Sequence, residues 1–124
     1  MATFAAHSAL GAGVCAAPAH LLGAPTEAVV ALTVYGAILG SLPDTLSWLL
    51  AKRKGGPTEA EWKDTLHNEA PWWLMWQLPY ALHVWLDRLF HDPLDPNAKW
   101  WRTKGWLEIT MWYASGVLLW YAFR

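Results

Sequence analysis

The chain has 124 residues, of which 55% are hydrophobic and only 15% are charged, and its formal net charge is -1. The length suits a single domain over residues 1–124, and the slight negative charge leaves no basic surface for a nucleic acid. About a quarter of the residues in a soluble domain are charged, so the low share here favours an integral membrane protein.

Two stretches near the N-terminus are apolar enough, and long enough, to cross a bilayer. Residues 1–26 carry no formal charge, and residues 28–51 carry only Asp44. A spanning helix needs about 20 predominantly apolar residues. We therefore expect helices over 2–22 and 27–51.

Small residues predict that these two helices pack closely as an antiparallel hairpin. They recur at four-residue spacing in the first helix, as in Ala12 and Ala16, and in the second helix as Gly36 and Gly40. This spacing lets two helix backbones approach each other inside a membrane. Cys15 has no second cysteine to pair with, so we expect no internal disulfide and an inert packing role.

The second half of the chain predicts one polar helix and two further apolar ones. A capping-box pattern opens a short polar helix over 58–67. Residues 70–91 are apolar but contain Pro79, which either kinks one spanning helix or separates two short ones. The last apolar helix is expected over 100–123. The expected fold class is thus an all-α integral membrane protein with about four apolar helices.

Tryptophan is the most unusual feature of the composition. The chain has 11 tryptophans, and nearly all of them lie near the ends of the apolar runs. An indole ring suits the boundary between lipid and water, so we interpret them as an aromatic belt facing the lipid bilayer. Lysine and arginine are balanced between the two sides, which leaves the membrane orientation open.

Asp44 is the one charge within the second apolar stretch, directly after Pro43. Ionisable residues inside membrane segments are costly and usually functional, although Asp44 could instead cap a helix that restarts after Pro43. His7 lies 17 residues before Ala24 in the turn, and Asp44 lies 20 residues after it. At about 1.5 Å per residue, the two lie within about 5 Å of the same height. An imidazole and a carboxylate at one height suit zinc, and a simple hydrogen bond between them is the alternative.

More candidate ligands follow in the third apolar region. His83, Asp87 and His91 are spaced four residues apart, on one face of a helix, where two neighbours can chelate one metal ion. The alternative is an ordinary charged helix end. His67, just before the tryptophan-rich segment, is a further candidate ligand, and Glu69 is a candidate general base.

Together these motifs resemble the membrane-bound metal-dependent hydrolases of the DUF457 or YdjM-like group. The matching residues are His7 in AAHSALGAG, Asp44 in GAILGSLPD, His67 in LHNEA, and His83 and Asp87 in LHVWLDRLFH. The resemblance implies helices gathered around a divalent-metal site, hydrolase activity, and an inner-membrane location in a bacterium or a phage-infected cell. The family's polar stretch after the second helix is reduced here to His67 and Asn68. Because 16 residues separate His67 from His83, one straight helix would place them about 24 Å apart. One site containing all five residues therefore requires a sharp bend near Gln77–Pro79.

Three functions remain open from the sequence. The first is a small membrane-embedded hydrolase that uses a divalent metal ion, zinc. The second is a non-catalytic, tryptophan-rich subunit or scaffold, packed on other membrane proteins or on copies of itself, with pigment binding through His7 or His83 as a variant. The third is a transport or lysis element, because buried carboxylates also mark ion paths.

Overall fold

The structure is a computed structural model that describes residues 4–53, 72–90 and 100–124. The elements in these ranges are α1 (Phe4–Leu21), α2 (Thr26–Arg53), the 3-10 helix η1 (Trp72–Trp76), α4 (Leu78–Phe90) and α5 (Trp100–Phe123). The all-helical class is confirmed, and the helices expected over 2–22, 27–51 and 100–123 are present with bounds shifted by at most two residues. The polar helix expected over 58–67 lies outside the described residues.

Fewer helices than expected pass a test of length and hydropathy for a membrane span. Among the described residues, one segment is long and apolar enough to cross a membrane, Thr26–Leu46 of α2. The 13 residues of α4 are too few to span alone. α1 is rich in alanine and glycine and α5 in tryptophan and tyrosine, which are less hydrophobic than leucine or isoleucine. Four apolar spanning helices are therefore not confirmed.

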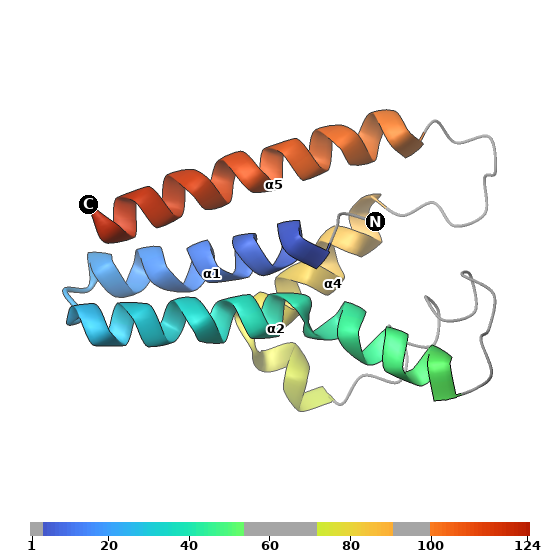
Figure 1. The fold of residues 1–124 in the computed structure, drawn as a ribbon, viewed down its shortest axis with the longest axis horizontal. Coiled ribbons are helices and arrows are strands. Elements are labelled where there is room, and N and C mark those ends of the chain that lie inside the picture. The colour runs from blue at the N-terminus through green and yellow to red at the C-terminus, as the bar shows by residue number, and fades with distance from the viewer. Residues whose placement is uncertain (1–3, 54–71, 91–99) are drawn as a thin grey trace.

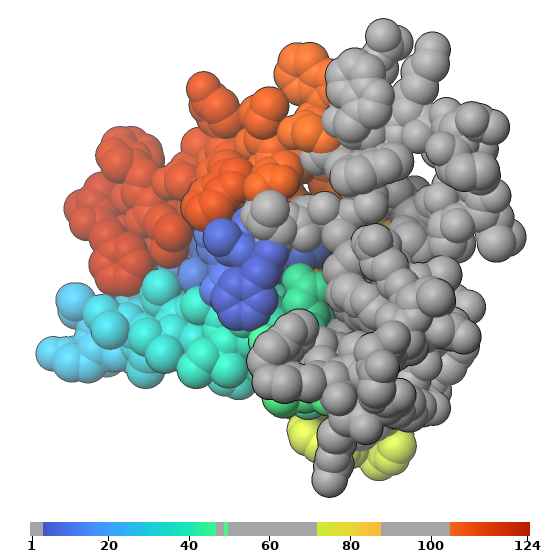
Figure 2. Space-filling view, turned by 45° about the vertical axis from the view of Figure 1, so that its right-hand side comes forward, coloured from blue at the N-terminus to red at the C-terminus, as the bar shows by residue number. Residues whose placement is uncertain are grey.

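Helix α1 lies between α2 and α5 (Figure 1). In the space-filling view α1 is visible as a strip between these two helices (Figure 2). A turn joins α1 to α2: Gly23 has a φ of 74°, and the Ala24 N–H donates to the Ala19 carbonyl at 3.0 Å. This bond pattern is a Schellman cap, in which glycine takes the left-handed conformation without a steric penalty. The antiparallel hairpin expected from the sequence is thus present.

Glycines bring α1 and α2 into direct backbone contact. A Cβ atom on Gly11 would overlap the carbonyl oxygen of Gly36, and one on Gly40 would overlap the carbonyl oxygen of His7. The patch predicted at Gly36 and Gly40 does face α1, but its partner there is Gly11, which the spacing pattern had not singled out. Gly13 faces the other way, toward α5.

The chain breaks between η1 and α4, at Gln77. Pro79 lies in the first turn of α4, where its missing N–H leaves no helical bond unmade. The Tyr35 hydroxyl of α2 donates a hydrogen bond to Gln77 Oε1, which fastens the break against α2. Of the two arrangements left open for Pro79, two short helices that meet there is the one observed.

Helix α2 continues through Pro43 and does not restart after it. A proline inside a helix cannot donate to the carbonyl four residues earlier, here that of Leu39, and its ring pushes that carbonyl aside. Such a residue bends a helix, and Figure 1 shows α2 changing direction in its second half. Asp44 is therefore inside a helix, and the suggestion that it caps a new one is wrong.

Candidate metal centre

Four of the predicted site residues meet where α1, α2 and α4 come together. His7 Nε2 lies 3.3 Å from Asp87 Oδ1. His83 Nε2 lies 3.4 Å from Asp44 Oδ1 and 3.2 Å from Asp87 Oδ2. The imidazole rings of His7 and His83 are stacked, with their centroids 3.5 Å apart. One imidazole from α1, one carboxylate from α2 and one of each from α4 thus share one small volume.

Backbone features of each helix explain why these side chains meet. Because Gly40 has no side chain, the backbone of α1 at His7 lies directly against the backbone of α2 at Gly40. The break at Gln77 lets α4 turn back beside this part of α2. His83 and Asp87 are four residues apart, so both lie on the face of α4 that is turned inward.

The cluster is almost completely shielded from solvent. The side chains of His7 and His83 are 1% and 2% exposed, and those of Asp44 and Asp87 are 13% and 10% exposed. Buried carboxylates are costly unless positive charge and hydrogen bonds compensate them. The described ion partners of the two carboxylates are the imidazoles of His7 and His83.

The orientation of His83 places hydrogen-bond acceptors at both of its ring nitrogens. Its Nδ1 atom lies 2.5 Å from the carbonyl oxygen of Gly40. A carbonyl oxygen only accepts hydrogen bonds, so Nδ1 carries the hydrogen and donates it. In the neutral ring, Nε2 then presents a lone pair to the carboxylate oxygens of Asp44 and Asp87, which also only accept. Either a proton or a metal ion must lie among these atoms.

The position of His7 favours a metal ion. Its Nε2 atom is buried and has no hydrogen-bond partner, because its 3.3 Å contact with Asp87 lacks hydrogen-bonding geometry. The hydrogen bond to Asp44 that the sequence offered as an alternative is likewise not among the contacts of His7. Ligand atoms of His7, Asp44 and His83 all lie within 4.8 Å of one another, so this buried group could hold one metal ion.

The remaining candidates lie elsewhere. His67, Glu69 and His91 fall outside the described residues. His20, near the turn, packs against Tyr121 of α5 with ring centroids 5.1 Å apart, at the opposite end of α1 from His7. The contribution that the sequence did not reveal is the Gly40 carbonyl, which orients His83, because no residue type marks a carbonyl as a partner.

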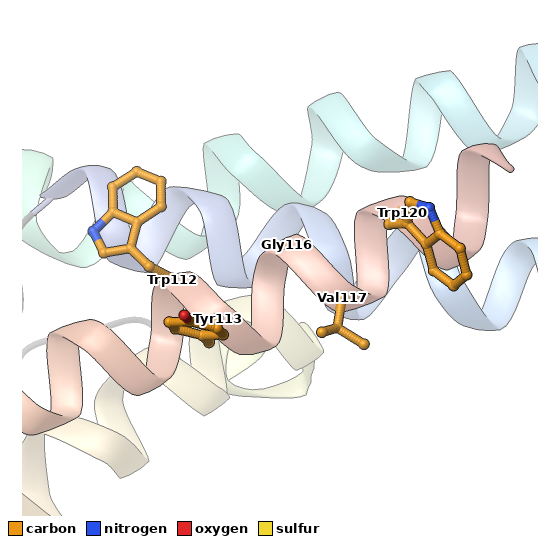
Figure 3. Close-up of a pocket in the computed structure, with 5 residues that line it drawn as sticks. All are labelled: Trp112, Tyr113, Gly116, Val117 and Trp120. Carbon is orange, nitrogen blue, oxygen red and sulfur yellow. The ribbon is translucent and has the colours of Figure 1, made fainter.

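A second surface feature lies on α5, on the side turned away from α1. An apolar groove of about 440 Å³ is lined by Trp112, Tyr113, Gly116, Val117 and Trp120, which are labelled in Figure 3. None of these side chains is a carboxylate, an imidazole or a thiol. The groove therefore offers apolar contact and no ligands for a metal ion.

Comparisons with known proteins add no relative. No family model, no curated protein and no solved structure matches the chain.

Proposed function

We propose that this chain is a small membrane-embedded hydrolase that depends on one divalent metal ion, zinc. The observation that carries the proposal is the meeting of two imidazoles and two carboxylates from three helices in one buried volume. Members on different helices lie at least 37 residues apart in the sequence, the separation of His7 and Asp44. Ordinary charge pairing at a helix end therefore does not account for the cluster.

The mixture of ligand atoms supports zinc over harder cations. Zinc accepts imidazole nitrogen together with carboxylate oxygen, usually in tetrahedral geometry. Magnesium and calcium prefer shells made of oxygen atoms. A backbone carbonyl that holds the far nitrogen of a ligating histidine, as Gly40 holds His83 Nδ1, is a usual second-shell partner for such a metal.

The geometry suggests a division of roles. A divalent ion held by His7, Asp44 and His83 would polarise a water molecule and the oxygen of a substrate carbonyl or phosphoryl group. Asp87 contacts both imidazoles, so it is placed to orient them or to accept a proton from that water. Glu69, the general base proposed from the sequence, remains an alternative for this last role.

The second candidate is a metal-stapled scaffold without catalysis. If Asp87 is a ligand, four protein donors complete a tetrahedral shell and leave no open position, as in structural zinc sites. The broad aromatic surface of α5 favours packing on lipids, on other membrane proteins or on copies of this chain, since Trp106, Tyr113 and Trp120 are 71%, 76% and 66% exposed.

Elemental analysis of detergent-purified protein tests the metal centre. We expect about one zinc ion per wild-type chain, and affinity reduced about 100-fold or more in Asp44→Asn and His83→Ala, because each loses a ligand. His20→Ala is the matched control, since His20 lies at the other end of α1 and should leave the zinc content unchanged. Equal zinc content in all four proteins would overturn the proposal.

Catalysis is tested separately, with zinc-stripped and zinc-reloaded protein. The probes are two chromogenic substrates, a p-nitrophenyl carboxylic ester and bis(p-nitrophenyl) phosphate. Hydrolysis that returns with zinc, and that Asp87→Asn abolishes while keeping its metal, supports the hydrolase. Stoichiometric zinc without hydrolysis of either probe, and with a higher melting temperature, favours the scaffold.

A further inference from the structure

We infer that residues 72–90 form a re-entrant hairpin, which enters and leaves the membrane on the same side, and that it positions the metal centre in the half of the bilayer on that side. The inference rests on the membrane embedding that is part of the proposed function. It goes beyond that function because it assigns the path of the chain and the side from which a ligand reaches the centre.

The spanning segment of α2 provides a depth scale. Thr26–Leu46 has 21 residues, which at about 1.5 Å per residue matches a hydrocarbon core about 30 Å thick. Tyr35 is 9 residues from one end and 11 from the other, so it lies near the middle of the bilayer. Asp44 is 9 residues beyond Tyr35 in the same helix, about 14 Å nearer the Arg53 end of α2.

Two contacts place η1 and α4 on this scale. The break at Gln77 receives the hydrogen bond of Tyr35, which puts the tip of the hairpin near the middle of the bilayer. His83, six residues further on, donates to the Gly40 carbonyl and lies 3.4 Å from Asp44. α4 therefore rises from the middle of the bilayer toward the end of α2 that carries Asp44.

The first arm of the hairpin lies on the same side. Figure 1 shows that η1 starts on the side where α2 ends, and that α4 leaves the break toward that side again. Leu74 of η1 and Tyr80 of α4 pack together against Leu42 and Leu46 of α2, which are in the same half of α2 as Asp44. Neither arm reaches the level of the α1–α2 turn.

Non-helical backbone inside a bilayer is tolerated only when its polar groups find partners in the protein. At this tip the polar groups of Gln77 do. The Gln77 N–H donates to the Leu74 carbonyl at 3.0 Å, and the Gln77 carbonyl accepts from the Ala81 N–H at 2.9 Å. The Gln77 side chain is bound by Tyr35, and Pro79 has no N–H to satisfy.

The consequence is an odd number of crossings, made by α1, α2 and α5. The 24 residues of α5 reach about 36 Å, which is long enough to cross. Its C-terminal end lies beside the α1–α2 turn, where Ala122 packs with Ala16 and Ala19 (Figure 1). The metal centre is at the other end of α1. A ligand therefore reaches the centre from the lipid–water boundary on the side of the N-terminus.

Single-cysteine labelling in sealed membrane vesicles tests this path. In a Cys15→Ala background, Leu49→Cys, Trp72→Cys, Leu22→Cys and Phe123→Cys are treated with a membrane-impermeant maleimide, with intact or opened vesicles. We expect Leu49→Cys and Trp72→Cys to label from one face, and Leu22→Cys and Phe123→Cys from the other. Trp76→Cys, one residue before the break, should be at least 10-fold slower to label from either face.

Labelling of Leu49→Cys and Phe123→Cys from the same face would overturn the inference, because a spanning segment over 72–90 would place the two ends in that way. Failure of the membrane proposal looks different, since all five positions, Trp76→Cys included, would then label rapidly in intact vesicles. The zinc content of each variant is measured in parallel. A variant that keeps its zinc but labels from the unexpected face contradicts the path of the chain and leaves the metal centre intact.

Discussion

The two ends of α1 meet their neighbours through opposite chemistry. Near the turn, Ala16 and Ala19 form an apolar cluster with Val29 of α2 and Ala122 of α5. At the other end, the imidazole of His7 lies among two carboxylates and a second imidazole. One end of α1 is thus buried by close apolar packing, and the other end is buried among polar groups whose burial is costly.

The difference distinguishes the contacts that pack the helices together from the polar cluster that lies between them. The turn end shows that small residues suffice to join α1, α2 and α5. Buried ion pairs are rarely more stabilising than apolar packing of the same volume, so stability alone does not explain the polar end. A bound cation would compensate both carboxylates and would provide a partner for the buried Nε2 atom of His7.

The largest effect should come from removing the metal ion. When the free zinc concentration is 1,000 times the dissociation constant of the site, binding stabilises the folded state by about 4 kcal/mol. A chelator should therefore lower the wild-type melting temperature and speed amide hydrogen exchange in α4, while the turn end stays protected. The chelator should leave Asp44→Asn unchanged. Equally faster hydrogen exchange at both ends of α1 would show that the polar end and the turn end are not stabilised independently.

A smaller loss should follow from Gly36→Ala, which acts through packing alone. The new Cβ would overlap the backbone carbonyl of Gly11, so α1 and α2 must separate, at a cost of about 2–3 kcal/mol. Thermal melting in detergent measures the loss. Gly116→Ala is the matched control, because no atom lies within 4 Å of the Cβ it would gain. Equal melting temperatures for the two variants would count against backbone contact as the force that joins the hairpin.

Tyr35→Phe removes the hydrogen bond to Gln77 and should cost about 1 kcal/mol. This bond fixes Gln77, where the chain breaks, and so fixes the direction of α4, which carries His83 and Asp87. Zinc affinity should therefore fall together with stability, although Tyr35 is not a ligand. Competition with a zinc-binding dye measures the affinity. An unchanged zinc affinity would show that the position of α4 does not depend on the hydrogen bond between Tyr35 and Gln77.

The smallest effect is expected for Ser8→Ala. The Ser8 hydroxyl donates to the Ala37 carbonyl at 3.0 Å and joins α1 to α2 close to the metal centre. A hydrogen bond between membrane helices contributes about 0.6 kcal/mol on average. Thr110→Ala is the control, because the Thr110 hydroxyl bonds within its own helix, to the Trp106 carbonyl. A Ser8→Ala loss no larger than that of the control would assign the joining entirely to the glycines.

Features that depend on neighbouring residues could be predicted from the sequence. The apolar runs predicted α1, α2 and α5 because helix formation follows local hydrophobicity. The four-residue spacing of His83 and Asp87 placed both on one face of α4, and similar distances from the turn, 17 and 20 residues, placed His7 near the height of Asp44. The expectation of four apolar spanning helices is not confirmed, because among the described residues only Thr26–Leu46 passes a test of length and hydropathy, and α4 is short.

Only the tertiary structure decided how these residues meet. Asp87 contacts both imidazoles, His83 donates to the Gly40 carbonyl, and Gly11 faces Gly36. Each of these contacts depends on the bend at Gln77 or on the close approach of α1 and α2. Residues on different helices, far apart in the chain, come together through packing that no short stretch encodes. The sequence by itself therefore determined the helices and the identity of the metal-binding candidates, whereas the packing of three helices determined that they form one centre.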